Sequence, residues 1–134
     1  MTEPVIIGIN QNKWVKNAST RMINLSRKDD AIGAKNCNEV IGTDYSVPAG
    51  KKLTILQIFV AGSSAASYDH ANIYASLISD NASGNIIMRY LMSTLQNSHQ
   101  TMNVNLEFTA GQFVVASHGQ SGYIENMIGV ECDV

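Results

Sequence analysis

Within residues 100–108, polar and apolar side chains alternate from Thr101 onward, and this alternation constrains the fold more than any other feature of the chain. Met102, Val104, Leu106 and Phe108 form the apolar set, and threonine, asparagine and glutamate stand between them. Because successive side chains of an extended strand point to opposite faces, a period of two predicts a strand with one buried face. Such a strand is typical of an antiparallel sheet that covers a core on one side.

Further strands are predicted on both sides of this segment. Residues 53–60 are apolar on both faces and rich in β-branched side chains, as expected for a central strand in a packed sandwich. Residues 113–117 follow a short turn and form the next predicted strand. From Tyr123 the apolar residues Ile124, Ile128 and Val130 fall on one face, which predicts a last strand reaching nearly to the C-terminus.

Residues 72–79 and 85–92 are predicted to form a hairpin, because the turn-forming residues 80–84 lie between them. A helix is the competing interpretation, since Ile87, Tyr90, Leu91 and Leu95 also recur at helical spacing. We favour strands, because the flanking turn residues and the short neighbouring segments suit a sheet.

The chain has 134 residues, a length that allows one well-buried core, so we expect a single domain spanning residues 1–134. Its core sandwich is expected over residues 44–134, with N-terminal strands and a loop over residues 1–43. In this N-terminal part, strands are predicted at residues 5–9, 19–25 and 40–45, and a long loop between residues 26 and 38.

A short motif occurs twice and predicts two corners of the fold. Residues 47–53 and 108–114 share the pattern apolar, any, Ala, Gly, any, any, apolar, and each leads into a hydrophobic strand. Gly50 and Gly111 permit the positive φ of a tight corner, which a chain needs where it crosses between two sheets. We therefore predict an all-β fold with little or no helix, a two-sheet antiparallel β-sandwich of jelly-roll type.

Charge is distributed unevenly along the chain. Residues 1–52 contain eight basic and five acidic residues, a balance of +3, whereas residues 53–134 contain one basic and six acidic residues, a balance of −5. One interpretation is that the basic region docks on an acidic surface, such as the C-terminal part of a neighbouring subunit. The alternative, which we favour, is scattered surface lysine that keeps the protein soluble.

No motif for catalysis, metal binding or phosphate binding is present in the sequence, so we expect no enzymatic activity, no metal and no cofactor. Cys37 and Cys132 are expected to be free thiols, since a domain of this size needs no disulfide and two isolated cysteines do not make a zinc site. The three histidines stand beside turn-forming residues and are predicted to be solvated loop residues: His70, His99 and His118. Three aspartates lack the spacing of a calcium loop and are predicted to be surface charges: Asp29, Asp30 and Asp44.

One loop cluster has the residue types of a sugar-binding site. Tyr68 can stack on a sugar ring while Asp69, His70 and Asn72 bind its hydroxyl groups, with Trp14 as a second stacking platform. The alternative is an ordinary polar connection with Tyr68 on the rim of the core and Trp14 inside it. We favour the ordinary connection for the loop, whereas for Trp14 the stacking platform and the core position both stay open.

Charge is sparse after residue 53, and serine, threonine, asparagine and glutamine occupy many alternating positions. A sheet face of this kind is prone to association unless its edges are covered or it packs against copies of itself. We therefore expect a homo-oligomer, with a trimer as one candidate. The apolar runs are too short to span a bilayer and the N-terminus has no signal-peptide pattern, so we expect no membrane insertion.

The runs Val-Pro-Ala-Gly-Lys-Lys-Leu-Thr-Ile at residues 47–55 and Leu-Glu-Phe-Thr-Ala-Gly-Gln-Phe-Val-Val at residues 106–115 resemble small β-sandwich or jelly-roll proteins associated with tailed-phage virions. The chain is similar, less closely, to the jelly-roll heads of the tumour-necrosis-factor and complement type. The resemblance covers residues 44–134 and implies a structural or attachment role in an assembly of repeated copies, in the virion or the cytoplasm of the producing cell. A carbohydrate-binding module is the alternative function, and neither nucleic acid nor a catalytic site is implied.

Overall fold

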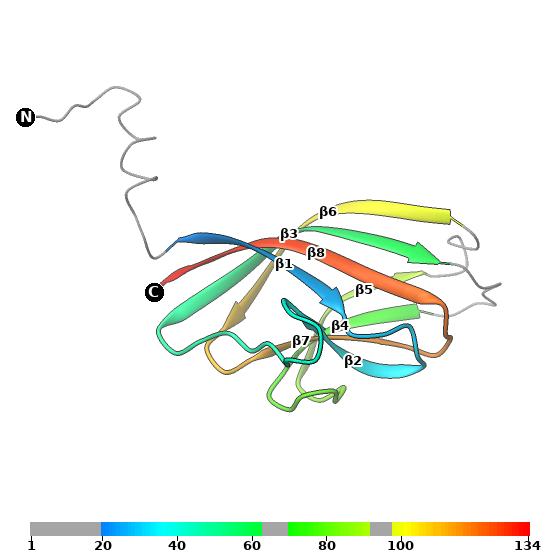
Figure 1. Cartoon of the computed structure of the whole chain (residues 1–134), viewed down its shortest axis with the longest axis horizontal. Coiled ribbons are helices and arrows are strands. Elements are labelled where there is room, and N and C mark those ends of the chain that lie inside the picture. The colour runs from blue at the N-terminus through cyan, green and yellow to red at the C-terminus, as the bar shows by residue number, and fades with distance from the viewer. Residues whose placement is uncertain (1–19, 63–69, 92–97) are drawn as a thin grey trace, which may run out of the picture.

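The computed structural model describes residues 20–62, 70–91 and 98–134, and within these residues every regular element is a β-strand (Figure 1). All strand pairs are antiparallel. The eight strands are β1 (Arg21–Arg27), β2 (Gly33–Asn38), β3 (Lys51–Gly62), β4 (His70–Ser76), β5 (Asn85–Leu91), β6 (Ser98–Thr109), β7 (Phe113–His118) and β8 (Tyr123–Asp133). The predicted all-β, antiparallel fold is therefore confirmed.

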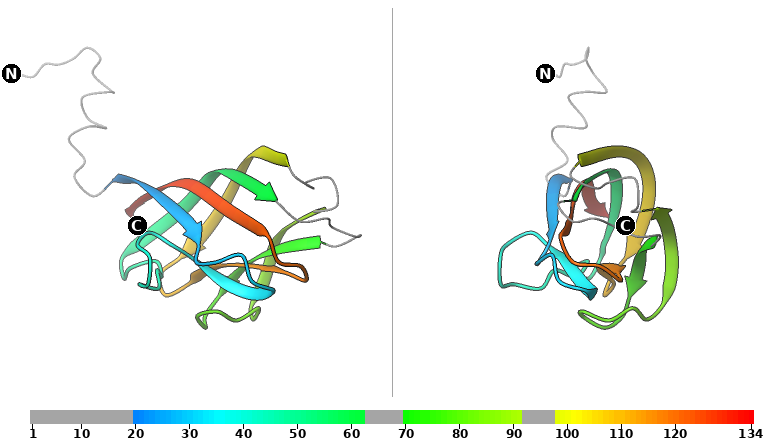
Figure 2. Two further views of the ribbon diagram at one scale, coloured as in Figure 1. Left: turned by 45° about the vertical axis from the view of Figure 1, so that its right-hand side comes forward. Right: turned by 90° about the vertical axis from the view of Figure 1, so that its right-hand side faces the viewer.

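The eight strands form one hydrogen-bonded sheet in the order β5-β4-β7-β2-β1-β8-β3-β6. This sheet curls round on itself and nearly closes, as the view along the molecule in Figure 2 shows. The structure does not confirm two separate sheets, because β2 joins the two halves. Residues 33–36 of β2 pair with β7, whereas Cys37 and Asn38 pair with Arg27 and Ser26 of β1.

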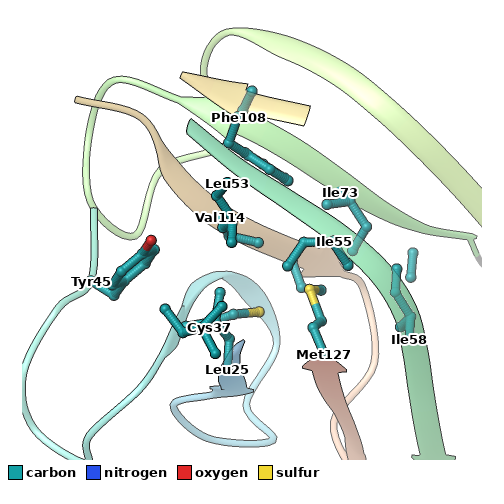
Figure 3. Close-up of a cluster of buried hydrophobic side chains, with 14 of the residues drawn as sticks. Leu25, Cys37, Tyr45, Leu53, Ile55, Ile58, Ile73, Phe108, Val114 and Met127 are labelled. Carbon is teal, nitrogen blue, oxygen red and sulfur yellow. The ribbon is translucent and has the colours of Figure 1, made fainter. Parts of the chain in front are cut away.

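The core fills the inside of this curl (Figure 3). Leu53, Ile55 and Ile58 of β3 contribute to it together with side chains from the other strands. Ile73 on β4, Phe108 on β6 and Val114 on β7 are also fully buried, so both halves of the sheet pack against one common core.

The alternation of inward and outward side chains along β3 shifts by one residue at Leu56. The register shifts between Ile55 and Gln57, which leaves Leu56 as an extra residue opposite β8. Such a β-bulge turns the side-chain alternation by one residue, so Ile55 and Ile58 both face the core although they are three apart. The bulge thus explains why residues 53–60 are apolar on both faces. The outward Leu56 and Phe59 are exposed, and no second layer of described residues covers them.

The repeated corner motif is confirmed. Gly50 and Gly111 have φ values of 76° and 85°, and each closes an equivalent turn in which residue Lys51 or Gln112 donates its backbone N–H to the carbonyl of Pro48 or Thr109. The two corners also contact each other, because Val47 N–H donates to Gln112 O at 2.9 Å and Gly111 N–H donates to Val47 O at 2.8 Å. The corner at Gly111 connects β6 to β7, which lie in different halves of the sheet.

The hairpin predicted over residues 72–92 is present as β4 and β5, which pair directly, so the helical interpretation is wrong for the described residues 70–91. Residues 21–27 are a strand as predicted, whereas the predicted strand at residues 5–9 lies outside the described residues. Both cysteines are free thiols, as expected, with Cys37 buried and Cys132 half-buried.

Two predictions for the N-terminal part are wrong. The expected loop at residues 26–38 contains β2, which pairs with β7 and β1 and buries Asn36, Cys37 and Asn38. The expected strand at residues 40–45 is mainly a tight turn, in which Val40 and Thr43 form an isolated bridge around Gly42. In the first case, pairing with β7 and β1 made a strand of residues whose local strand signal is weak. In the second case, the positive φ of Gly42 reversed the chain.

No helix in the described part of the chain is long and apolar enough to cross a membrane.

Candidate functional site

The outward surface of β1, β8, β3 and β6 is the candidate functional site, and we call it the outer face. The strand registers arrange its side chains in rows across the four strands. Three of these rows are Met22–Val130–Thr54–Glu107, Asn24–Ile128–Gln57–Asn103 and Ser26–Asn126–Phe59–Thr101. The bulged Leu56 adds a further side chain to the middle of the face.

Four large apolar side chains on the outer face are exposed to solvent. Met22 is 57% exposed, Leu56 42%, Phe59 37% and Ile128 40%. Isolated exposed apolar residues are normal on proteins, but these four lie on three adjacent strands of one sheet. The outer face therefore carries an apolar area of the kind that marks contact surfaces.

The polar side chains of the outer face are almost all uncharged. Ser26 Oγ and Asn126 Oδ1 form a hydrogen bond across β1 and β8, and Gln57 Nε2 donates to Asn103 Oδ1 at 3.3 Å across β3 and β6. The ring of His99 stacks on Phe59 with centroids 5.4 Å apart. The face therefore presents apolar and neutral polar groups, with no charged side chain in its two central rows.

Charge is confined to the ends of the outer face. Lys52 and Glu107 form an ion pair of 3.6 Å at one end. At the other end Lys28 follows Ser26 and pairs with Asp80 and Asp44 at 2.6 and 3.0 Å. These ion pairs leave little charge unbalanced at the ends of the face.

The apolar residues predicted to share one face of the last strand lie on the outer face. Ile128 is exposed, and Ile124 and Val130 are half-buried. The inward positions of β8 instead include Glu125 and Glu131, beside Tyr123 and Met127. In β8, three branched apolar side chains therefore face outward and two glutamates face inward, the reverse of a simple core strand. The outward apolar side chains of β8 make the outer face apolar.

Glu125 is the centre of a buried polar network. Tyr90 Oη donates to Glu125 Oε2, and Arg27 Nε and His118 Nε2 lie 3.7 and 3.6 Å from Glu125 Oε1. The guanidinium of Arg27 also donates to the carbonyls of Ala116, Asp29 and Gly33. Burial and the adjacent Glu125 carboxylate raise the pKa of Tyr90, because both favour the neutral phenol.

Glu131 organises a second network nearer the start of β1. Tyr45 Oη donates to Glu131 Oε2 at 2.8 Å, and Arg21 Nε donates to Glu131 Oε1 at 3.0 Å. Arg21 also pairs with Glu39, and its pKa is raised by these carboxylates, that of Glu39 first. Burial and the bond to Glu131 raise the pKa of the Tyr45 phenol. Each buried glutamate is thus held by partners from distant strands and loops.

The turn at residues 40–43 is held against the β4–β5 turn through Asp44. Asp44 accepts hydrogen bonds from Ser79 and Lys28, and these two contacts lower its pKa. The backbone N–H of Asn36 donates to Asp80 Oδ1, and the backbone N–H of Asp80 donates to Asn36 Oδ1. Asp80 also pairs with Lys28, whose pKa is raised by Asp80 and Asp44. A pocket of about 280 Å³ lies between this turn and β1, but its charged groups Arg27, Lys28 and Glu39 are already paired within the chain.

The uneven charge along the sequence is largely balanced by ion pairs within one chain. Every basic residue from the first 52 that the structure describes has an acidic partner within the same chain. Several pairs join the basic N-terminal part to the acidic C-terminal part, such as Lys51 with Asp133 and Arg21 with Glu131. Docking on the acidic part of a neighbouring subunit is therefore not needed to balance these charges.

The predicted sugar-binding residues are described only in part. Trp14, Tyr68 and Asp69 lie outside the described residues. His70 is exposed at the start of β4, and Asn72 accepts a hydrogen bond from Arg89 Nε at 2.8 Å. Arg89 and Ser117 are the cross-strand neighbours of Asn72, and they could not be predicted because strand register is not visible in a sequence.

The prediction that the three histidines are solvated loop residues is wrong for all three, because each lies within a strand: His70 in β4, His99 in β6 and His118 in β7. His118 is buried at the end of β7 against Glu125 and Tyr123, and its Nδ1 bonds Gln120 O at 2.7 Å. His99 is exposed but lies within β6. Among residues 20–62, 70–91 and 98–134, no group of three or more His, Cys, Asp or Glu residues is placed to hold a metal ion.

No protein-family profile matches the chain, and no curated protein matches it in sequence. A chain in the acid-stable capsid of Helicobacter pylori bacteriophage KHP30 is similar in structure, with 12% identity and a TM-score of 0.50 over 88% of this chain and 90% of that chain. The coat protein of tobacco streak virus gives 8% identity and a TM-score of 0.47 over 87% and 89% of the two chains. A carbohydrate-binding module from Cellvibrio mixtus lichenase 5A gives 16% identity and a TM-score of 0.31 over 84% and 86%.

The chain therefore has a weak structural resemblance to a phage capsid chain. This confirms, at the level of the fold, the resemblance noted from the corner motifs. At 12% identity the phage capsid match shows a shared fold and nothing about partners, and the two lower scores support no argument.

Proposed function

We propose that this chain is a non-enzymatic structural or attachment module of a phage virion, of the decoration, head-to-tail or fibre type, and that it acts as a homo-oligomer. The observation that carries this proposal is the outer face, which combines exposed Met22, Leu56, Phe59 and Ile128 with neutral polar side chains. The desolvation free energy is small when a second protein surface covers an apolar surface that has no charges at its centre.

The proposal includes a jelly-roll sandwich as the finer description of the fold. The strand order divides into β5-β4-β7-β2 and β1-β8-β3-β6, and only two residue pairs between β1 and β2 join these halves. Eight antiparallel strands in two four-stranded halves, with corners between them, are the arrangement of a jelly roll. The fold shared with a phage capsid chain supports the same description.

The experiment is a measurement of molar mass by light scattering at micromolar concentration and at two salt concentrations. We expect a mass above that of the 14.5 kDa monomer, and no strong salt dependence, because the outer face is uncharged at its centre. Phe59→Asp and Ile128→Asp are each expected to lower the measured molar mass, since a carboxylate at either position opposes burial of the outer face.

Leu77→Asp is the matched control. Leu77 is 71% exposed directly after β4, in the half of the sheet that does not carry the outer face. This variant is expected to keep the wild-type mass. A wild-type protein that is monomeric at micromolar concentration would contradict the proposal.

A carbohydrate-binding module is the second candidate function, and one observation favours it. Asn72 lies beside Arg89 and Ser117 on the outward surface of β4, β5 and β7, with Tyr74 two residues further along β4. An aromatic ring among amide, guanidinium and hydroxyl groups is a common surface for a sugar. Sugar binding on a glycan array that is lost in Tyr68→Ala and Tyr74→Ala would support this function, and no binding across the array would reject it.

A further inference from the structure

We infer that two copies of this chain pair through the free edges of β6, antiparallel and about a two-fold axis at Asn103. The inference rests on the proposed assembly function and names one contact that builds the assembly. β6 is 12 residues long and pairs with β3 along one edge. No strand of the described residues pairs with its other edge, because β6 ends the sheet.

The two end strands of the sheet differ in how their edges are protected. Native proteins protect an edge by making the strand short, by a bulge or by charged side chains. β5 has seven residues, an irregular register against β4 and the charged Arg89. β6 has an irregular register against β3 between Asn103 and Leu106, but it is long and its outward residues from Thr101 to Asn105 are uncharged. β6 is therefore the edge that a second strand can extend.

The β6 sequence is self-complementary in one antiparallel register. With Asn103 opposite the partner's Asn103, Thr101 lies opposite the partner's Asn105 and His99 opposite the partner's Glu107. Each His99 then has a carboxylate to bond, and no like charges face each other. Glu107 keeps Lys52 on its β3 side, 3.6 Å away.

The inward side chains of β6 favour the same pairing. Met102, Val104 and Leu106 pack against the core but are only partly buried, because β6 is the end strand of the sheet that the described residues form. In the register about Asn103, Met102 lies opposite the partner's Val104, and the reverse pair is made by symmetry. The partner strand thus covers apolar surface that one copy leaves exposed.

Disulfide trapping in the full-length chain tests this register. All variants carry Cys132→Ser, and Cys37 stays in place because it is buried. Asn103→Cys is expected to form a covalent dimer under mild oxidation, because residues directly opposite in an antiparallel pair have Cα atoms about 4.5–5.5 Å apart, within the range of a disulfide. Thiols held together in an interface have an effective concentration of about millimolar, so cross-linking is expected on the order of a thousandfold faster than by micromolar collision.

Asn105→Cys is the matched control, since Asn105 is also an exposed asparagine of β6. In the inferred register two Asn105 residues are offset by about 13 Å along the strands, too far for a disulfide, so this variant is expected to stay uncross-linked. A mixture of Thr101→Cys and Asn105→Cys is expected to give the mixed dimer. Equal cross-linking of Asn103→Cys and Asn105→Cys, or none by Asn103→Cys, overturns the inference.

The molar mass of the wild-type protein separates this result from the wider proposal. If the wild type is an oligomer and Asn103→Cys does not cross-link, the β6 pairing is wrong and the assembly function stands. If the wild type is a monomer and Asn103→Cys does not cross-link, both fail.

Discussion

Glu125 is a carboxylate without solvent exposure, and its stability in the core depends on the donors around it. Tyr90 Oη reaches Glu125 Oε2 directly, whereas the nitrogens of Arg27 and His118 lie at ion-pair distance from Oε1. A buried carboxylate oxygen that loses its donor keeps the cost of desolvation without compensation. The stability of the core therefore depends on the hydroxyl group of Tyr90.

We expect Tyr90→Phe to lower the free energy of unfolding by about 1–3 kcal/mol, because it leaves Glu125 Oε2 without its donor while keeping the ring in place. Urea unfolding followed by circular dichroism measures this change. Tyr74→Phe is the control, since Tyr74 lies on the outward surface of β4, and we expect it to change stability by less than about 0.5 kcal/mol. Equal stability of the two variants would show that the Tyr90 hydroxyl is not needed.

At the scale of the strands, two glycines are required for different reasons. A Cβ atom at Gly129 of β8 would lie 2.5 Å from Thr54 O and 3.2 Å from Ile55 Cα, beside the bulge of β3. At Gly111 a Cβ atom would meet nothing within 4 Å, but φ is 85°. The first position excludes a side chain by contact, and the second disfavours one through the backbone conformation.

The order in which alanine and asparagine reduce stability should therefore be opposite at the two positions. At Gly111 we expect alanine to cost about 1–2 kcal/mol and asparagine less, because asparagine tolerates the left-handed conformation. At Gly129 we expect alanine to cost about 1–3 kcal/mol and asparagine more, because any larger side chain pushes β8 away from β3. Thermal and urea unfolding of the four variants measure this. The same ranking at both positions would contradict the argument.

At the scale of the whole molecule, stability should fall at alkaline pH. The pKa of Tyr90 is raised in the folded protein by burial and by Glu125, so its stabilising effect is complete below the unfolded pKa of about 10. As the pH rises above that value, the unfolded chain loses a proton that the folded chain keeps. The free energy of unfolding then falls by about 1.4 kcal/mol per pH unit for this group.

Tyr45 and Lys28 also have raised pKa values and act in the same direction. Melting temperatures between pH 8 and pH 11, combined with tyrosinate absorbance, are expected to show unfolding and tyrosine ionisation together. Tyr90→Phe is expected to have a shallower pH dependence than the wild type above about pH 10. An unchanged dependence in this variant would assign the alkaline transition to other groups.

Local sequence determined the elements whose signals are local. The alternation of residues 100–108 follows from the geometry of an extended strand, and the corners at Gly50 and Gly111 follow from the conformational freedom of glycine. The hairpin of β4 and β5 was predictable because the turn residues lie between its strands.

The tertiary structure decided which face of each strand is inside. The pattern of β8 shows that two faces exist, but Ile124 and Ile128 look like core residues and Glu125 does not. Glu125 can be buried only because Arg27 and Tyr90 arrive from distant strands to bind it, and β2 forms only because β7 and β1 pair with it. Periodicity depends on neighbours along the chain, whereas the burial of a charge and the pairing of a weak strand depend on partners that only the fold brings together.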